Sequence, residues 1–186
     1  MKFEIVGLTS DAGWGADYGA VDVFCRRLGV DYAVKASNIG PVVFEDRHEK
    51  SPCALCAHLR RGAVNAMARE RGCNKVALAH HLDDAIETLL MSMLYEGRIH
   101  CFLPKTHLDK SGLFVIRPLV YVEERVVERV ALDLELPVVK NPCPAAGHTK
   151  RHYVKQVVSE LSAETPSIRS RLKACLKSLW RKGVPV

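Results

Sequence analysis

Short apolar runs alternate with longer amphipathic segments along most of the chain. The first run, residues 3–8, predicts a strand, and the apolar positions that follow recur at helical spacing over residues 20–28 until Gly29. The same pattern predicts further strands at 32–36, 75–79, 114–116 and 137–139. It predicts further helices at 54–71, 82–95, 123–134, 150–164 and 167–180, with Pro166 at the last break.

Strands that alternate with helices of this length indicate βαβ units. We therefore expect an α/β fold with a parallel sheet and helices on its faces. Residues 1–148 are expected to form this domain, and residues 149–186 a basic helical segment. Ligands of such sheets bind beyond the carboxyl ends of the strands, so residues that follow strands are the first candidates for a site.

The composition is that of an ordinary globular protein, with 48% hydrophobic and 26% charged residues in a chain of 186. No apolar run approaches the roughly 18 residues that span a bilayer. The first residues also lack the apolar stretch and cleavage site of a secretory signal. We expect a cytoplasmic protein that has no membrane partner.

Positive charge gathers at the C-terminal end of the chain. The formal net charge is +6, and residues 141–186 carry nine Lys or Arg against only Glu160 and Glu164. Such a segment can neutralise phosphates, which suits a polyanionic partner. A solvated helix face explains the same pattern equally well.

Two of the seven cysteines, Cys53 and Cys56, fall on the first turn of a predicted helix. There both thiols can point at one ion, and the helix dipole favours the thiolate. A C-x-x-C pair alone also fits a redox pair or half of a zinc site. No second pair follows, and the next candidate ligand is a single cysteine.

That cysteine, Cys143, lies between two prolines in a loop after a predicted strand. Sheet topology can bring it to the helix start, and three thiols then converge on one metal centre. Three protein ligands on a four-iron cluster leave one iron open for chemistry. Zinc on the same thiols and a simply buried Cys143 remain alternatives.

A second polar group follows the strand at 75–79. His80, His81, Asp83 and Asp84 leave that strand and open the next helix, where substrates of α/β proteins bind. An aspartate at this position also commonly caps a helix.

Two adjacent arginines stand close to the cysteine pair. Arg60 and Arg61 lie about one turn beyond Cys56 on the same predicted helix. They can hold a phosphate near the metal, although exposed arginines often have no specific role.

Four stretches occur in the order P-C-A-L-C-x-x-L-R-R-G, K-V-A-L-A-H-H-L-D-D-A-x-E-T-L, I-R-P-L and P-V-V-K-N-P-C-P. Together they resemble the tRNA 2-thiocytidine synthetase-like branch of the PP-loop ATPases, over nearly the whole chain. The resemblance implies a Rossmann-like fold of the adenine nucleotide α-hydrolase type, a 4Fe-4S cluster, Mg²⁺ with ATP, and a tRNA substrate.

By this resemblance the cluster ligands are Cys53, Cys56 and Cys143. Asp83 and Arg60 are then catalytic residues, and the nucleotide-binding residues are His80, Asp84 and Arg61. The implied reaction is adenylation of a pyrimidine carbonyl oxygen, followed by replacement of AMP by sulfur. The sulfur would come from a donor protein or sulfide, and a homodimer is compatible with the sequence.

The family's phosphate-binding loop, of the type S-G-G-x-D-S, does not occur in these 186 residues. The segment from Asp11 to Gly15 is a poor substitute and is interpreted as an ordinary turn. We therefore expect a fragment whose first strand and PP-loop are missing, which puts ATP-dependent activity of the chain in question. A non-catalytic metal- and RNA-binding relative and a PP-loop ATPase with another substrate are the alternatives.

Overall fold

The computed structural model describes residues 3–47 and 51–182 of the chain. The described residues form two compact units, each of which is treated by itself. The first unit takes its residues from 1–76, 109–113 and 131–146, and the second from 77–108, 114–130 and 147–186.

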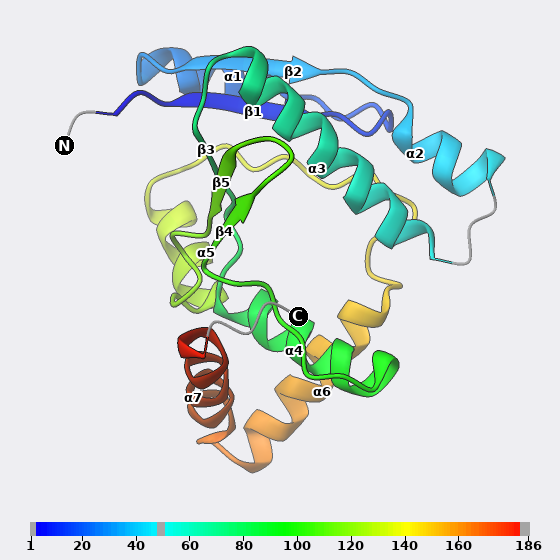
Figure 1. Ribbon diagram of the computed structural model, residues 1–186, viewed down its shortest axis with the longest axis vertical. Helices are drawn as coiled ribbons and strands as arrows, with labels where there is room; N and C mark the ends of the chain where they lie inside the picture. The colour runs from blue at the N-terminus through cyan, green and yellow to red at the C-terminus, as the bar shows by residue number, and fades with distance from the viewer. Residues whose placement is uncertain (1–2, 48–50, 183–186) are drawn as a thin grey trace. The chain divides into compact units, whose positions relative to one another are not determined.

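The first unit is built on a parallel pair of strands, β1 (Val6–Ser10) and β2 (Asp31–Lys35). Val6 lies opposite Asp31 and Ser10 lies opposite Lys35, so the two strands end at the same edge. Helix α1 (Gly19–Arg27) connects them and packs on β2, and α3 (Pro52–Glu70) packs on β1 (Figure 1). This βαβ arrangement is the one that the alternating pattern predicts.

Two short helical segments follow β2 and were not predicted, namely α2 (Ile39–Pro41) and the π-helical turn η1 (Val42–Asp46). Gly40 lies so close to Trp14 that a Cβ atom there would be 2.2 Å from the indole nitrogen. The backbone N–H of Gly40 also donates to the carbonyl of Ala12 at 2.7 Å. A glycine is therefore required for this segment to pack on the loop after β1.

A second sheet contains β3 (Lys75–Ala77), β4 (Lys105–Leu108) and β5 (Leu113–Ile116) in the order β3-β5-β4. Strand β4 was not predicted, because its exposed Lys105 and His107 interrupt the apolar pattern. Only four residues join β4 to β5, too few for the crossover that parallel neighbours need, so the two strands form a hairpin.

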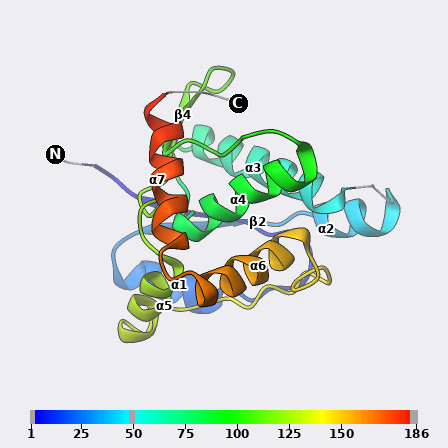
Figure 2. The same ribbon diagram turned by 90° about the horizontal axis from the view of Figure 1, so that it is seen from below.

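The second unit has its core between three helices, α4 (Leu82–Glu96), α6 (Lys150–Glu164) and α7 (Ile168–Arg181). Figure 2 shows α6 and α7 flanking α4. Leu82, Ile86, Val154 and Leu176 are each at most 2% exposed and form the centre of this core. The basic C-terminal helices are thus packed elements of the second unit.

Most predicted elements are confirmed, including α5 (Glu124–Asp133) and the α/β class with its parallel strands. The strand predicted at 137–139 is wrong, because these residues are irregular and Val138 is 79% exposed. Pro137 has no N–H to donate to a sheet, which disfavours a strand there. Among the described residues no helix is long and apolar enough to cross a membrane.

Truncating Leu176 tests the three-helix core. This side chain is fully buried, so Leu176→Ala leaves a cavity and should lower the free energy of unfolding by about 2–5 kcal/mol. Denaturant unfolding followed by circular dichroism measures the change. The exposed neighbour on the same helix, Cys175→Ala, is the matched control and should change stability by less than about 0.5 kcal/mol. Equal effects of the two variants would contradict this assignment of the core.

Candidate metal centre

The first turn of α3 presents two of the three predicted metal ligands. Pro52 occupies the start of the helix, where its missing N–H costs nothing, and Cys53 and Cys56 follow on the first turn. Cys53 is exposed and Cys56 is buried. The third thiol, Cys143, is half-buried in a loop where its backbone N–H donates to Oδ1 of Asn141 at 3.1 Å.

The three thiols belong to the first unit, and Cys143 acts electrostatically on the other two. Burial raises the pKa of Cys53, and the charge of Cys143 raises it further. Burial likewise raises the pKa of Cys56, with smaller increases from Cys143 and Cys53. The cysteine pair and the distant Cys143 therefore lie in one neighbourhood, as the sequence predicts.

The described residues contain no group of three or more His, Cys, Asp or Glu side chains arranged to hold a metal ion. The thiols are thus close enough to interact through their charges without standing in ligating positions. Three thiols in one neighbourhood match the donor chemistry of an iron–sulfur or zinc centre. Binding a metal there would need adjustment of the loop around Cys143 or of the side-chain rotamers.

The two predicted arginines differ in their surroundings. The positive charge of Arg60 lowers the pKa of Cys56 against the larger effect of burial, which places its guanidinium near the thiols. Arg61 is exposed, and its Nε donates to the carbonyl of Ala57, 3.3 Å away on the same helix. Arg60 therefore lies beside the candidate metal centre, and Arg61 lies along the helix surface.

The loop after β1 belongs to the same neighbourhood, which the sequence analysis missed. Asp11 Oδ1 accepts hydrogen bonds from the backbone N–H of Gly13 at 3.2 Å and from the hydroxyl of Tyr18 at 3.3 Å. Burial and Asp11 raise the pKa of Tyr18, whereas the charge of Arg60 lowers it. Tyr18 therefore lies within electrostatic reach of Arg60.

A glycine and an aspartate directly after a strand were the available signal for this loop. Gly13 has a φ of +89°, and a Cβ atom there would lie 2.5 Å from the carbonyl oxygen of Ser37. The segment is a specifically folded loop, more constrained than the ordinary turn that we predicted.

The second predicted group, His80, Asp83 and Asp84, lies in the second unit. Asp83 is 6% exposed, and both of its carboxylate oxygens have partners. Oδ2 accepts the backbone N–H of Glu124 at 2.7 Å, and Oδ1 pairs with the guanidinium of Arg169. Burial acts to raise the pKa of this carboxyl, but these two donors outweigh it and hold the pKa below its usual value.

Asp84 takes part in capping the start of α4. Its carboxylate accepts the backbone N–H of His81 at 3.0 Å, and its own N–H donates to Nδ1 of His81 at 3.3 Å. This reciprocal pair is a capping box with histidine as the N-cap residue. The alternative interpretation of an aspartate here as a helix cap is therefore confirmed for Asp84.

Asp84 also lines a small hollow of about 230 Å³ in the second unit. Acidic and basic groups are mixed around it, including Glu87, Arg151 and Lys155, which already pair with each other or with Glu124. His80 lies apart from these groups, stacked on Phe102 with ring centroids 4.9 Å apart, and its Nδ1 accepts from Arg117 Nε at 3.3 Å.

The sequence profile of the PP-loop domain matches residues 14–161. The chain belongs to the PP-loop family. The four motifs predicted this family, and the match confirms the prediction. The matched residues include the three thiols, Arg60 and the start of α4.

Relatives with assigned names point to one branch of the PP-loop family. The chain is similar to a tRNA-cytidine(32) 2-sulfurtransferase of Geobacter metallireducens, with 34% identity over 96% of this chain and 71% of the relative. It is also similar to the enzyme of the same name from Coxiella burnetii, with 39% identity over the same shares of the two chains.

A solved structure supports the fold. The U34-tRNA thiolase NcsA of Methanococcus maripaludis, determined with its [4Fe-4S] cluster, matches with a TM-score of 0.74 at 22% sequence identity. The match covers 96% of this chain and 62% of that protein. At this identity the likeness supports the PP-loop fold and says nothing of individual site residues.

The Asp83 contacts predict a pH-dependent contribution to stability. Asp83→Asn should lower the free energy of unfolding by about 1–3 kcal/mol at pH 7, because a hydrogen-bonded charge is lost from a buried position. The pKa of Asp83 is lower in the folded state, so its contribution is complete above the ordinary carboxyl pKa of about 3.9. It is lost as the pH falls from there through the folded-state pKa.

Denaturant unfolding at pH 7, 5 and 3 measures this difference. The difference in the free energy of unfolding between wild type and Asp83→Asn should be constant from pH 7 to 5 and smaller at pH 3. Glu160→Gln, which removes an exposed carboxylate of the same unit, is the control and should show little effect at any pH. A gap of the same size at all three pH values would contradict the role given to Asp83.

Proposed function

We propose that this chain carries out ATP-dependent 2-thiolation of cytidine in tRNA, with Cys53, Cys56 and Cys143 as the ligands of a 4Fe-4S cluster. The observation that carries the proposal is that Cys143 lies close enough to Cys53 and Cys56 to act on both through its charge, within one unit and near Arg60. Assignment to the PP-loop family, and relatives named as tRNA-cytidine(32) 2-sulfurtransferases, support it independently.

The thiol set supports a cluster with one open position. Three cysteines leave one iron of a four-iron cluster without a protein ligand, and when bound the cluster would supply a site that holds sulfur for transfer. Zinc remains the competing metal, because thiolates bind both. The positive charge of Arg60 favours the thiolate form of Cys56 that either metal needs.

ATP supplies the leaving group in the proposed reaction. Transfer of AMP to the C2 oxygen of cytidine releases pyrophosphate, and sulfur then replaces that oxygen as AMP departs. Arg60 is proposed to stabilise the negative charge that develops on the substrate beside the thiols. Mg²⁺ is proposed to bind the ATP phosphates, as in other adenylating reactions of nucleotides.

His80, Asp84 and Arg61 are proposed to contact the nucleotide, and Asp83 to act in the reaction. The contacts of Asp83 favour an indirect part, because both of its oxygens are occupied by Glu124 and Arg169. Its proposed effect is to fix the start of α4 and the start of α5. A sulfur-donor protein or sulfide and a second copy of the chain complete the proposed partners.

Replacing Cys143 tests the metal centre. Anaerobic reconstitution of Cys143→Ala with iron and sulfide should yield much less bound cluster than wild type, because one of three protein ligands is gone. The exposed Cys175→Ala, which removes a thiol from α7, is the matched control and should bind as much iron as wild type. Iron and sulfide analysis with an anaerobic absorption spectrum gives the readout. Bound zinc without sulfide, or equal iron in both variants, would contradict the cluster assignment.

Thiolation itself is tested in a strain that lacks its own enzyme for this modification. Expression of this protein should restore 2-thiocytidine in tRNA, measured by nucleoside mass spectrometry. Arg60→Gln should lower the yield by about tenfold or more, as expected for loss of one group that stabilises developing charge. Arg69→Gln, at an exposed position of the same helix, should act like wild type.

The outcomes of the two experiments separate the alternatives. Cluster binding without thiocytidine would favour a non-catalytic relative. Another thionucleoside in place of thiocytidine would favour a PP-loop enzyme with a different substrate.

A further inference from the structure

A basic hollow lies in the second unit, apart from the groups discussed so far. Its volume is about 850 Å³, within the range of about 300–1,000 Å³ that is usual for ligand sites. Eight residues line the basic hollow: Leu103, Pro104, Lys105, Tyr121, Lys173, Lys177, Trp180 and Arg181.

The charge of the basic hollow has a single sign. Four of its eight lining residues are cations, and none is a carboxylate. None of these cations takes part in an ion pair within residues 3–47 and 51–182. A hollow with four positive charges outside ion pairs and no negative charge stabilises a bound anion.

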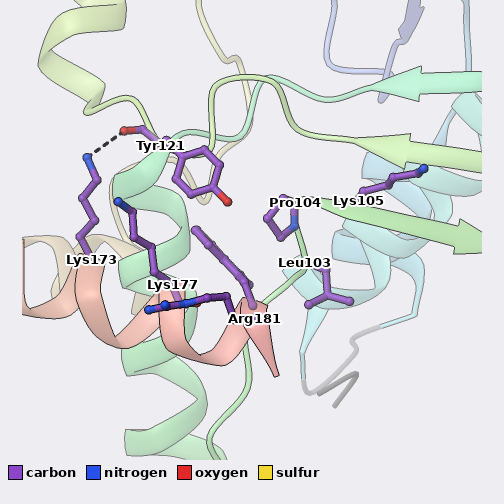
Figure 3. A pocket seen from close by; sticks show the side chains of 8 residues that line it. Leu103, Pro104, Lys105, Tyr121, Lys173, Lys177 and Arg181 are labelled. Atoms are coloured by element: carbon purple, nitrogen blue, oxygen red, sulfur yellow. Dashed lines mark hydrogen bonds between the residues drawn. The ribbon is translucent and has the colours of Figure 1, made fainter. Parts of the chain in front are cut away.

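The cations approach the hollow from two elements. Lys173, Lys177 and Arg181 are spaced four residues apart and therefore share one face of α7. Figure 3 shows Lys105 on the far side of Pro104 from these three residues. Positive charges along a helix face and across from it match the repeated phosphates of a nucleic acid strand better than a single small anion.

Aromatic rings accompany these charges. Trp180 is anchored, because its Nε1 donates to the carbonyl of Phe102 at 2.9 Å. Tyr121 meets the Trp180 ring edge-on, with centroids 5.3 Å apart and planes at 89°, and it remains 47% exposed. The backbone carbonyl of Tyr121 accepts from Lys173 Nζ at 3.2 Å, which connects the backbone at Tyr121 to α7 (Figure 3).

We propose that the basic hollow binds the RNA substrate, with backbone phosphates at Lys173, Lys177 and Arg181 and one unpaired base against the ring of Tyr121. This inference rests on the proposed function and adds to it a contact surface for the tRNA. Basic grooves with aromatic platforms are the usual means of holding single-stranded RNA. An acidic protein partner would use the same charges, whereas each nucleotide of an RNA strand also brings a planar base that can stack on Tyr121.

Charge reversal on α7 tests the phosphate contacts. Lys177→Glu should weaken binding of a fluorescein-labelled, unmodified tRNA transcript by roughly tenfold and reduce the slope of log K against log salt by about 1. Arg171→Glu makes the same charge change at an exposed position of the same helix, two residues from Lys173 and outside the basic hollow. It should leave both quantities nearly unchanged. Fluorescence anisotropy over a salt series gives the readout.

Replacement of the ring tests the base contact. Tyr121→Phe keeps the ring and should bind the transcript like wild type, whereas Tyr121→Leu loses stacking and should weaken binding on the order of tenfold. Thermal unfolding of both variants checks their folding. Photocrosslinking of wild-type protein to a 5-iodouridine-substituted transcript gives evidence that needs no variant, and the crosslinked peptides should contain Tyr121 or Trp180.

Equal weakening by Lys177→Glu and Arg171→Glu, with no effect of Tyr121→Leu, would overturn the proposal in favour of diffuse surface charge. Crosslinks confined to other segments would also overturn it. Binding to poly-glutamate that depends on Lys177 as strongly as tRNA binding does would indicate an acidic protein partner and overturn it too. These assays measure binding alone, so a chain that binds tRNA through the hollow but makes no thiocytidine would refute the proposed function and leave this inference standing.

Discussion

The buried carboxylate of Asp83 ties together three segments of the second unit that are far apart in sequence. It accepts the N–H of Glu124, 41 residues away, and pairs with Arg169, 86 residues away. Burying a carboxylate is costly unless it is fully partnered, so α4, the start of α5 and α7 must reach their positions together. The apolar core around Leu176 supplies the driving force, and the Asp83 contacts specify how the helices align.

A second cation repeats this arrangement one turn further along α4. Arg151 of α6 bonds to Glu87 at 2.9 Å and to the hydroxyl of Thr88 at 3.1 Å. Burial raises the pKa of Glu87, with Arg151 acting in the opposite direction. Part of the positive charge at the C-terminal end thus holds α6 and α7 to the acidic start of α4. Lys173, Lys177 and Arg181, which line the basic hollow, form no ion pair among the described residues.

The pattern of apolar positions along the sequence was sufficient to predict the elements in which these positions keep a regular period, such as α3 and α4. It failed for β4, where Lys105 and His107 alternate with partly buried residues, and at Val138, where apolar residues are simply exposed. The proximity of Cys143 to Cys53 and Cys56 was predicted, although residues 137–139 do not form the strand that was expected before Cys143. The partners of Asp83 could not be predicted, because nothing local marks Arg169 as its neighbour. Asp11 was missed although an aspartate and a glycine directly after a strand offered a local signal, whereas nothing local marks Tyr18 as its neighbour.

The histidine cap of α4 fixes a tautomer. Nδ1 of His81 accepts the N–H of Asp84, so its lone pair must be free and the ring proton of a neutral imidazole must sit on Nε2. That nitrogen lies 3.4 Å from a carboxylate oxygen of Asp84 and 3.8 Å from one of Glu124. The N-cap residue of α4 thereby faces both its own helix and the first residue of α5. The tautomer of one side chain is therefore set by the same hydrogen bond that begins the helix.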